Sequence, residues 1–128
     1  MELYVGGISQ GKLKFVLQKK RITYSNKLIS EGADCTVEDM LLKPIINQFH
    51  QFIRRLINDN GNVEEFIDKL IMVNLSVIII CNEVGYGIVP TDKEDRVYRE
   101  AVGRSCCKLA EHADTVERII CGMGQRIK

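Results

Sequence analysis

Residues 3–12 read Leu-Tyr-Val-Gly-Gly-Ile-Ser-Gln-Gly-Lys, a short apolar run followed by a glycine-rich segment that ends in lysine. The apolar run predicts a buried strand, and the two glycines after it predict a turn. Beyond Gly11, apolar side chains recur at helical spacing to about Lys20, which predicts an amphipathic helix. A strand, a glycine-rich loop and a helix in this order are typical of a phosphate-binding loop.

Residues 6–12 fit the phosphate-loop pattern G-x-x-x-x-G-K. Its glycines let backbone N–H groups surround an anion, the helix N-terminus adds partial positive charge, and the lysine neutralises phosphates. Leu13 stands where the full pattern has a serine or threonine that holds Mg²⁺, so a metal would be held through water or another acid. We expect phosphate binding here, in preference to a plain tight turn, by Gly6, Gly7, Ile8, Ser9, Gln10, Gly11, Lys12 and Leu13.

The composition predicts one α/β domain over residues 1–128, with 45% hydrophobic residues for its core. With 18 basic and 17 acidic residues the net charge is +1, so neither nucleic acid nor a membrane surface is an expected partner. A signal peptide and a long apolar run are both missing, which predicts a soluble cytoplasmic protein. The five cysteines form no C-x-x-C pair and are expected to be buried, Cys106 and Cys107 being the only redox candidates.

The remaining sequence alternates between strand and helix patterns. Strands are expected at residues 22–24, 73–80 and 116–121. Helices are expected from Thr36 to about residue 56, with a start or kink at Pro44, from Asn62 to residue 70, and from a capping box at Thr91 to about residue 112. This alternation implies a largely parallel sheet, whose ligands bind where strands end.

Residues 81–90, after the apolar run 73–80, contain Asn82 and Glu83 followed by glycines. They are expected to form a ligand loop, the alternative being an ordinary connection with a solvated Glu83.

The run from Asn82 to Pro90, continued by Arg96, Tyr98 and Arg99, closely resembles the C-terminal half of the bifunctional adenosylcobinamide kinase / adenosylcobinamide-phosphate guanylyltransferase family. The glycine loop matches that family's phosphate loop, and Asp34-Cys35 is similar to its Asp-Cys pair at the end of an inner strand. The resemblance is continuous from residue 78 to the C-terminus and patchy before it.

The resemblance implies a three-layer, P-loop NTPase-like (RecA-like) fold, a homotrimer and a place in the late corrinoid pathway. In that family ATP or GTP phosphorylates the aminopropanol hydroxyl of adenosylcobinamide, and GTP then yields GDP-cobinamide through a guanylylated histidine. Carried over by position, the catalytic residues are Lys12, Asp34 and Glu83, with Asp34 and Glu83 holding Mg²⁺. The substrate contacts carried over in the same way are Asn82, Gly85, Arg96 and Arg99.

The sequence departs from the family where the guanylylated histidine should lie, because the stretch between the first helix and Asp34-Cys35 is short. His50 and His112 sit in helical patterns typical of packed or dipole-stabilising imidazoles, which argues against guanylyl transfer. Three hypotheses stay open. The chain is a trimmed cobinamide kinase, a nucleotide- or corrinoid-binding module without turnover that serves as a regulatory or partner subunit, or a purely structural oligomer subunit.

Overall fold

The computed structural model describes residues 1–84 and 92–128, and within them six strands form one sheet in the order β2-β3-β4-β1-β5-β6. All neighbouring strands are parallel except β5 and β6. The strands are β1 (Glu2–Gly6), β2 (Ile29–Glu31), β3 (Ile45–Asn47), β4 (Ile78–Asn82), β5 (Thr115–Ile120) and β6 (Met123–Arg126). The helices are α1 (Lys12–Lys20), α2 (Val37–Leu42), α3 (Phe49–Asn58), α4 (Val63–Val73) and α5 (Lys93–His112).

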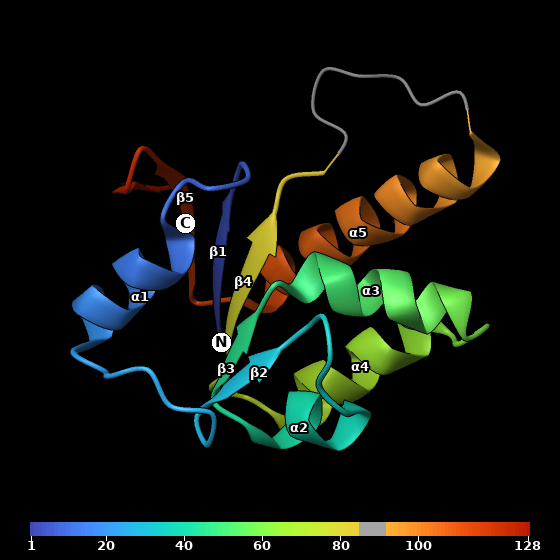
Figure 1. Ribbon diagram of the computed structural model, residues 1–128, viewed down its shortest axis with the longest axis horizontal. Helices are drawn as coiled ribbons and strands as arrows, with labels where there is room; N and C mark the ends of the chain where they lie inside the picture. The colour runs from blue at the N-terminus through green and yellow to red at the C-terminus, as the bar shows by residue number, and fades with distance from the viewer. Residues whose placement is uncertain (85–91) are drawn as a thin grey trace.

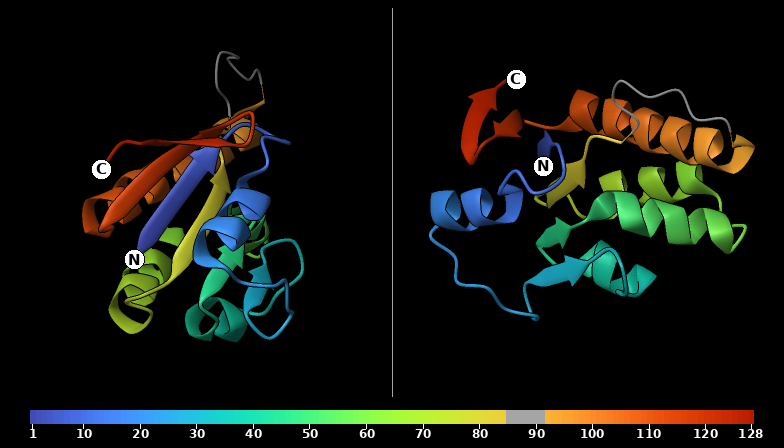
Figure 2. Two further views of the ribbon diagram at one scale, coloured as in Figure 1. Left: turned by 90° about the vertical axis from the view of Figure 1, so that its left-hand side faces the viewer. Right: turned by 45° about the horizontal axis from the view of Figure 1, so that its top comes forward.

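The sheet lies between two helical layers (Figures 1 and 2), with α1 on one face and α2 to α5 on the other. Successive side chains of β1 point to opposite faces of the sheet, and both faces are covered. Leu3 packs into the larger core, and Tyr4 packs into the smaller core beneath α1. In β4, Ile79 and Ile80 divide between the two cores in the same way. The expected three-layer α/β fold with a largely parallel sheet, of the P-loop NTPase-like class, is therefore confirmed. No helix in the described part of the chain is long and apolar enough to cross a bilayer.

Two helix starts lie where their capping residues predict them. Thr36 Oγ1 accepts a hydrogen bond from Asp39 N at 3.1 Å, and Asn62 Oδ1 accepts one from Glu65 N at 3.0 Å. At α5 the cap is Asp92, whose Oδ1 accepts from Glu94 N at 2.9 Å. The expected cap residue, Thr91, lies outside the described residues.

The prediction of a strand at residues 22–24 is wrong. Arg21 ends α1 in the left-handed conformation, and the first strand after it is β2, which pairs only with β3. Because β2 is an edge strand of the described sheet, the expectation that Asp34-Cys35 ends an inner strand is also wrong. Short edge strands carry little local signal, since their pairing is decided by the neighbouring strand.

The single helical stripe expected between Thr36 and residue 56 is divided by β3. Pro44 ends the helical run, and its carbonyl accepts a hydrogen bond from Ile78 N at 2.9 Å. Ile45 and Ile46 then alternate between the two cores, as strand residues do. Adjacent apolar residues fit helical spacing equally well, so periodicity alone gave the wrong element here.

The strand expected at residues 73–80 begins later, because α4 continues to Val73 and β4 starts at Ile78. The C-terminal strand β6 was not expected. Cys121 and Gly122 have φ values of 50° and 75°, as a two-residue hairpin turn between antiparallel strands requires.

Candidate functional site

The segment that fits the phosphate-loop pattern, residues 6–12, connects β1 to α1 and keeps the name phosphate loop below. Ser9 and Gly11 have φ values of 57° and 81°, so the backbone turns sharply before the helix begins. Gln10 is fixed to the turn after β5, since its carbonyl accepts from Gly122 N at 2.9 Å and its Oε1 accepts from Cys121 N at 2.7 Å. The turn after β5 thus helps to fix the course of the loop.

Lys12 is buried within this loop. Only 8% of its surface is exposed, and its Nζ donates to Gly7 O at 2.6 Å, so the side chain folds back over the loop. Burial lowers the pKa of Lys12, and the nearby Cys81 and Glu83 partly oppose that shift. A buried ammonium group with one carbonyl partner favours an anionic ligand, because an anion would offset the cost of burying the charge.

A cavity of about 290 Å³, called here the loop cavity, lies beside this segment. Its lining is Ile8, Ser9, Gln10, Gly11, Lys12, Leu13, Lys14, Asn47, Gln48 and Asn82. Five of the strands in the sheet run parallel, so the tips of β3 and β4 meet the loop at one edge. Asn47 at the tip of β3 was not singled out from the sequence, because its strand was read as a helix.

Glu83 lies directly beside the loop, since its backbone N donates to Gly6 O at 2.9 Å. Its carboxylate is held by Arg118 of β5, whose Nε and one terminal nitrogen donate to the two oxygens at 2.8 and 3.0 Å. This fork-to-fork geometry is a strong form of charge-assisted hydrogen bonding. The sequence does not single out Arg118, because no local pattern links it to Glu83, which lies 35 positions earlier.

A magnesium site does not fit the carboxylates that the sequence suggested. Asp34 is exposed on the turn after β2, beyond β3 and β4 from the loop, and it lines neither the loop cavity nor the cavities beside Glu83. Glu83 has both oxygens bound to Arg118. Among the described residues, no three histidine, cysteine or acidic side chains form a metal-binding group. Mg²⁺ prefers carboxylate and hydroxyl oxygens, which these positions do not offer together.

A second cavity of about 340 Å³, the His50 cavity, lies on the other side of Ile8 and Asn82. It is lined by Ile8, His50, Gln51, Arg54, Asn82, Glu83, Val84, Asp95, Tyr98 and Arg99. Of the expected substrate contacts, Asn82 and Arg99 line it together with Glu83, whereas Arg96 is exposed on α5 and does not. Gly85 lies outside the residues that the structure describes.

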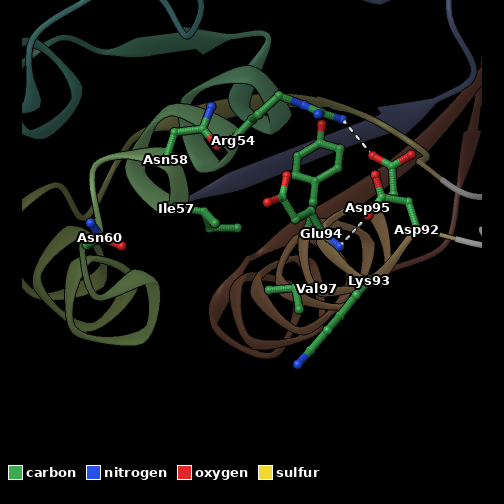
Figure 3. Close-up of a pocket in the computed structure, with 10 residues that line it drawn as sticks. Arg54, Ile57, Asn58, Asn60, Asp92, Lys93, Glu94, Asp95 and Val97 are labelled. Atoms are coloured by element: carbon green, nitrogen blue, oxygen red, sulfur yellow. Dashed lines mark hydrogen bonds and ion pairs between the residues drawn. The ribbon is translucent and has the colours of Figure 1, made fainter.

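The His50 cavity adjoins a groove of about 560 Å³ between α3 and α5, the α3–α5 groove (Figure 3). Arg54 of α3 reaches across to Asp95 of α5 at 3.6 Å, and its guanidinium group lies 3.9 Å from the centre of the Tyr98 ring. These three residues line both spaces and form the wall between them.

His50 is buried, and its Nδ1 accepts a hydrogen bond from Asn82 N at 3.3 Å. Burial, with smaller contributions from Lys12 and Arg54, lowers the pKa of His50 from 6.5 to about 4. The ring is therefore neutral at physiological pH and packs at the edge of the site. His112 is exposed at the end of α5.

We expect this buried imidazole to make the protein less stable in mild acid. A folded-state pKa below the unfolded one stabilises the fold above pH 6.5, and that contribution is lost as the pH falls toward 4. The free energy of unfolding should drop by about 2 kcal/mol more between pH 7 and pH 5 in the natural protein than in His50→Asn, whose amide oxygen can accept the same hydrogen bond. Urea titrations at both pH values measure this, and equal losses would contradict it.

The cysteines only partly follow the expectation of burial. Cys35 and Cys81 are buried, whereas Cys107 and Cys121 are exposed free thiols. Cys106 lies against Cys81, with 3.7 Å between the sulfur atoms. The sulfur contact of Cys106 is therefore with Cys81, whereas Cys107, the other member of the candidate redox pair, is exposed.

Comparison with known proteins identifies the family of the chain. Residues 9–127 match the family described as cobinamide kinase / cobinamide phosphate guanyltransferase. The chain belongs to this family. The match covers the phosphate loop from Ser9 onward and the tips of β3 and β4. It confirms the resemblance drawn from residues 82–90.

Two curated relatives are both described as bifunctional adenosylcobalamin biosynthesis protein CobU. The protein of Salmonella typhimurium is 42% identical over 78 residues, which are 55% of this chain and 43% of the relative. That of Escherichia coli is 33% identical over 69 residues, which are 54% of this chain and 38% of the relative. The chain therefore spans less than half the length of the curated relatives it matches.

Proposed function

We propose that this protein binds the phosphates of ATP or GTP at the loop of residues 6–12 and acts in corrinoid biosynthesis as an adenosylcobinamide kinase. The observation that carries the proposal is the buried Lys12 folded over a loop at the start of α1, directly beside Glu83. Backbone N–H groups and a lysine at a helix N-terminus are suited to a triphosphate. Family membership supplies the corrinoid as the acceptor.

In this proposal the γ-phosphoryl group lies between the loop and the His50 cavity. The aminopropanol hydroxyl attacks the γ-phosphorus, the bond from the γ-phosphorus to the bridging oxygen breaks, ADP or GDP leaves, and the hydroxyl proton is released to solvent. Lys12 stabilises the negative charge on the transferring group, and Arg99 at the His50 cavity contacts the acceptor or its product. The α3–α5 groove leaves room for the rest of a large acceptor. The homotrimer implied by the resemblance is part of the same proposal.

The test is phosphoryl transfer itself. Nucleotide labelled on its γ-phosphate, incubated with adenosylcobinamide and the folded protein, should give labelled adenosylcobinamide phosphate. Adenosylcobinamide phosphate offered as the acceptor should remain unlabelled, because its hydroxyl is already occupied. If saturating substrates leave the corrinoid unlabelled, the kinase proposal is wrong.

A second candidate is a nucleotide- or corrinoid-binding module that does not turn over. It is favoured by Leu13 in place of a metal-binding hydroxyl and by the pairing of Glu83 with Arg118. This candidate predicts saturable nucleotide binding without labelled product in the same experiment.

A further inference from the structure

The lining of the loop cavity supplies positive charge and amides. It contains Lys12 and Lys14, together with the amide side chains of Gln10, Asn47, Gln48 and Asn82. No aspartate or glutamate occurs among the described residues of this lining. Mg²⁺ at nucleotide sites is held by one or two carboxylates or hydroxyls in addition to phosphate oxygens and water. The cavity therefore suits the phosphates better than it suits their metal.

Asn47 lies where an aspartate could hold a metal ion in this cavity. It ends β3, the strand next to β4, and it lines the cavity beside Gln48 and Asn82. Its Nδ2 donates to Glu31 Oε2 at 2.9 Å, so the acid at the tip of β2 is already engaged by this amide. A neutral amide at the strand tip adds no attraction for a divalent cation.

Glu83 is the acid nearest to the loop, and Arg118 neutralises it. Both carboxylate oxygens accept from the guanidinium group, and both side chains are more than half buried. A metal bound by Glu83 would either replace these two charge-assisted hydrogen bonds or lie close to the guanidinium group and be repelled by it, and both are costly in a partly desolvated setting. Arg118 thus supplies the positive charge beside Glu83 that a metal would otherwise supply.

We propose that the phosphate loop binds a nucleoside triphosphate without a metal ion held by the protein, so that nucleotide affinity does not depend on Mg²⁺. Lys12, Lys14 and the backbone N–H groups of the loop neutralise the phosphates. A metal-free triphosphate carries more negative charge than its Mg²⁺ complex, and a cationic lining without carboxylates attracts it at least as strongly. This inference rests on the proposed nucleotide site.

Calorimetric titration with GTP and with ATP, in excess EDTA and in excess Mg²⁺, tests the inference directly. We expect dissociation constants that agree within about threefold between the two conditions. Lys12→Met should weaken binding by about 100-fold in both conditions. Metal-free binding that is as tight in Lys12→Met as in the natural protein would place the nucleotide elsewhere and overturn the inference.

A metal requirement should be created by supplying the missing hydroxyl at position 13 and releasing Glu83 from its ion pair with Arg118. Leu13→Ser combined with Arg118→Leu restores the hydroxyl and frees the Glu83 carboxylate, and Mg²⁺ should then tighten binding by about tenfold. The matched variant, Leu13→Ala with Arg118→Leu, lacks the hydroxyl and should gain less. Thermal unfolding of each variant without nucleotide verifies that it is folded.

The outcomes separate this inference from the proposed function. Binding that needs Mg²⁺, together with labelled corrinoid, overturns the inference and leaves the kinase standing. Metal-free binding without labelled corrinoid supports the inference and overturns the kinase. Folded protein that binds nucleotide in neither condition overturns both.

Discussion

Replacement of Lys12 by methionine is expected to weaken nucleotide binding by about 100-fold, close to 3 kcal/mol, because a buried ammonium group would no longer contact the phosphates. Methionine keeps the length and most of the volume of the side chain, so the loop should retain its course. The change is measured by calorimetry with GTP and ATP. If phosphoryl transfer occurs, the labelled product should disappear in the same variant.

Lys14→Met is the matched control. Lys14 also lines the loop cavity, but it is exposed, so water and salt screen its charge. Its loss should weaken binding by less than about fivefold. Equal effects of the two substitutions would mean that general positive charge, and not the buried Lys12, attracts the nucleotide.

The two states of the protein should respond in opposite directions to Lys12→Met. Without nucleotide the variant should be as stable as the natural protein or more stable, since methionine removes a buried charge whose partner is one carbonyl oxygen. With nucleotide, the natural protein gains stability through binding and the variant does not. Thermal unfolding with and without GTP shows both effects.

Features that depend on neighbouring residues could be predicted from the sequence. The phosphate loop is specified by its glycines and lysine, and the starts of α2 and α4 by Thr36 and Asn62, which bond to backbone groups three residues away. The hairpin into β6 belongs to the same class, because its two-residue turn, Cys121-Gly122, carries a glycine at a position of positive φ.

Features that depend on distant pairing could not be predicted. The three-residue β3 is a strand because β2 and β4 lie on either side of it, and no local pattern distinguishes it from a helix. Arg118 and Glu83 meet because β1 brings β4 and β5 to its two sides. Glu83 lies beside the loop, but its charge partner Arg118 is brought there by the fold, and no local sequence pattern predicts it.

Gly6→Ala is expected to lower the free energy of unfolding by about 3 kcal/mol, because β1 and β5 approach closely at this position. A Cβ atom on Gly6 would lie 2.4 Å from the carbonyl oxygen of Ile119, and backbone atoms cannot move aside as a flexible side chain can. The displaced strand end also carries the bond from Glu83 N to Gly6 O, so nucleotide binding should weaken together with stability.

Gly103→Ala is the matched control, because it replaces a glycine with alanine at a position where the added Cβ atom causes no clash. Gly103 lies within α5, and a Cβ atom there would have nothing within 4 Å. Alanine is the better helix former, so this variant should be more stable by about 0.5–1 kcal/mol. Urea unfolding of both variants measures the contrast. If Gly6→Ala unfolds at the same urea concentration as the natural protein, Gly6 is not in close contact with the backbone of Ile119. The packing of β1 against β5 would then not determine the position of the loop.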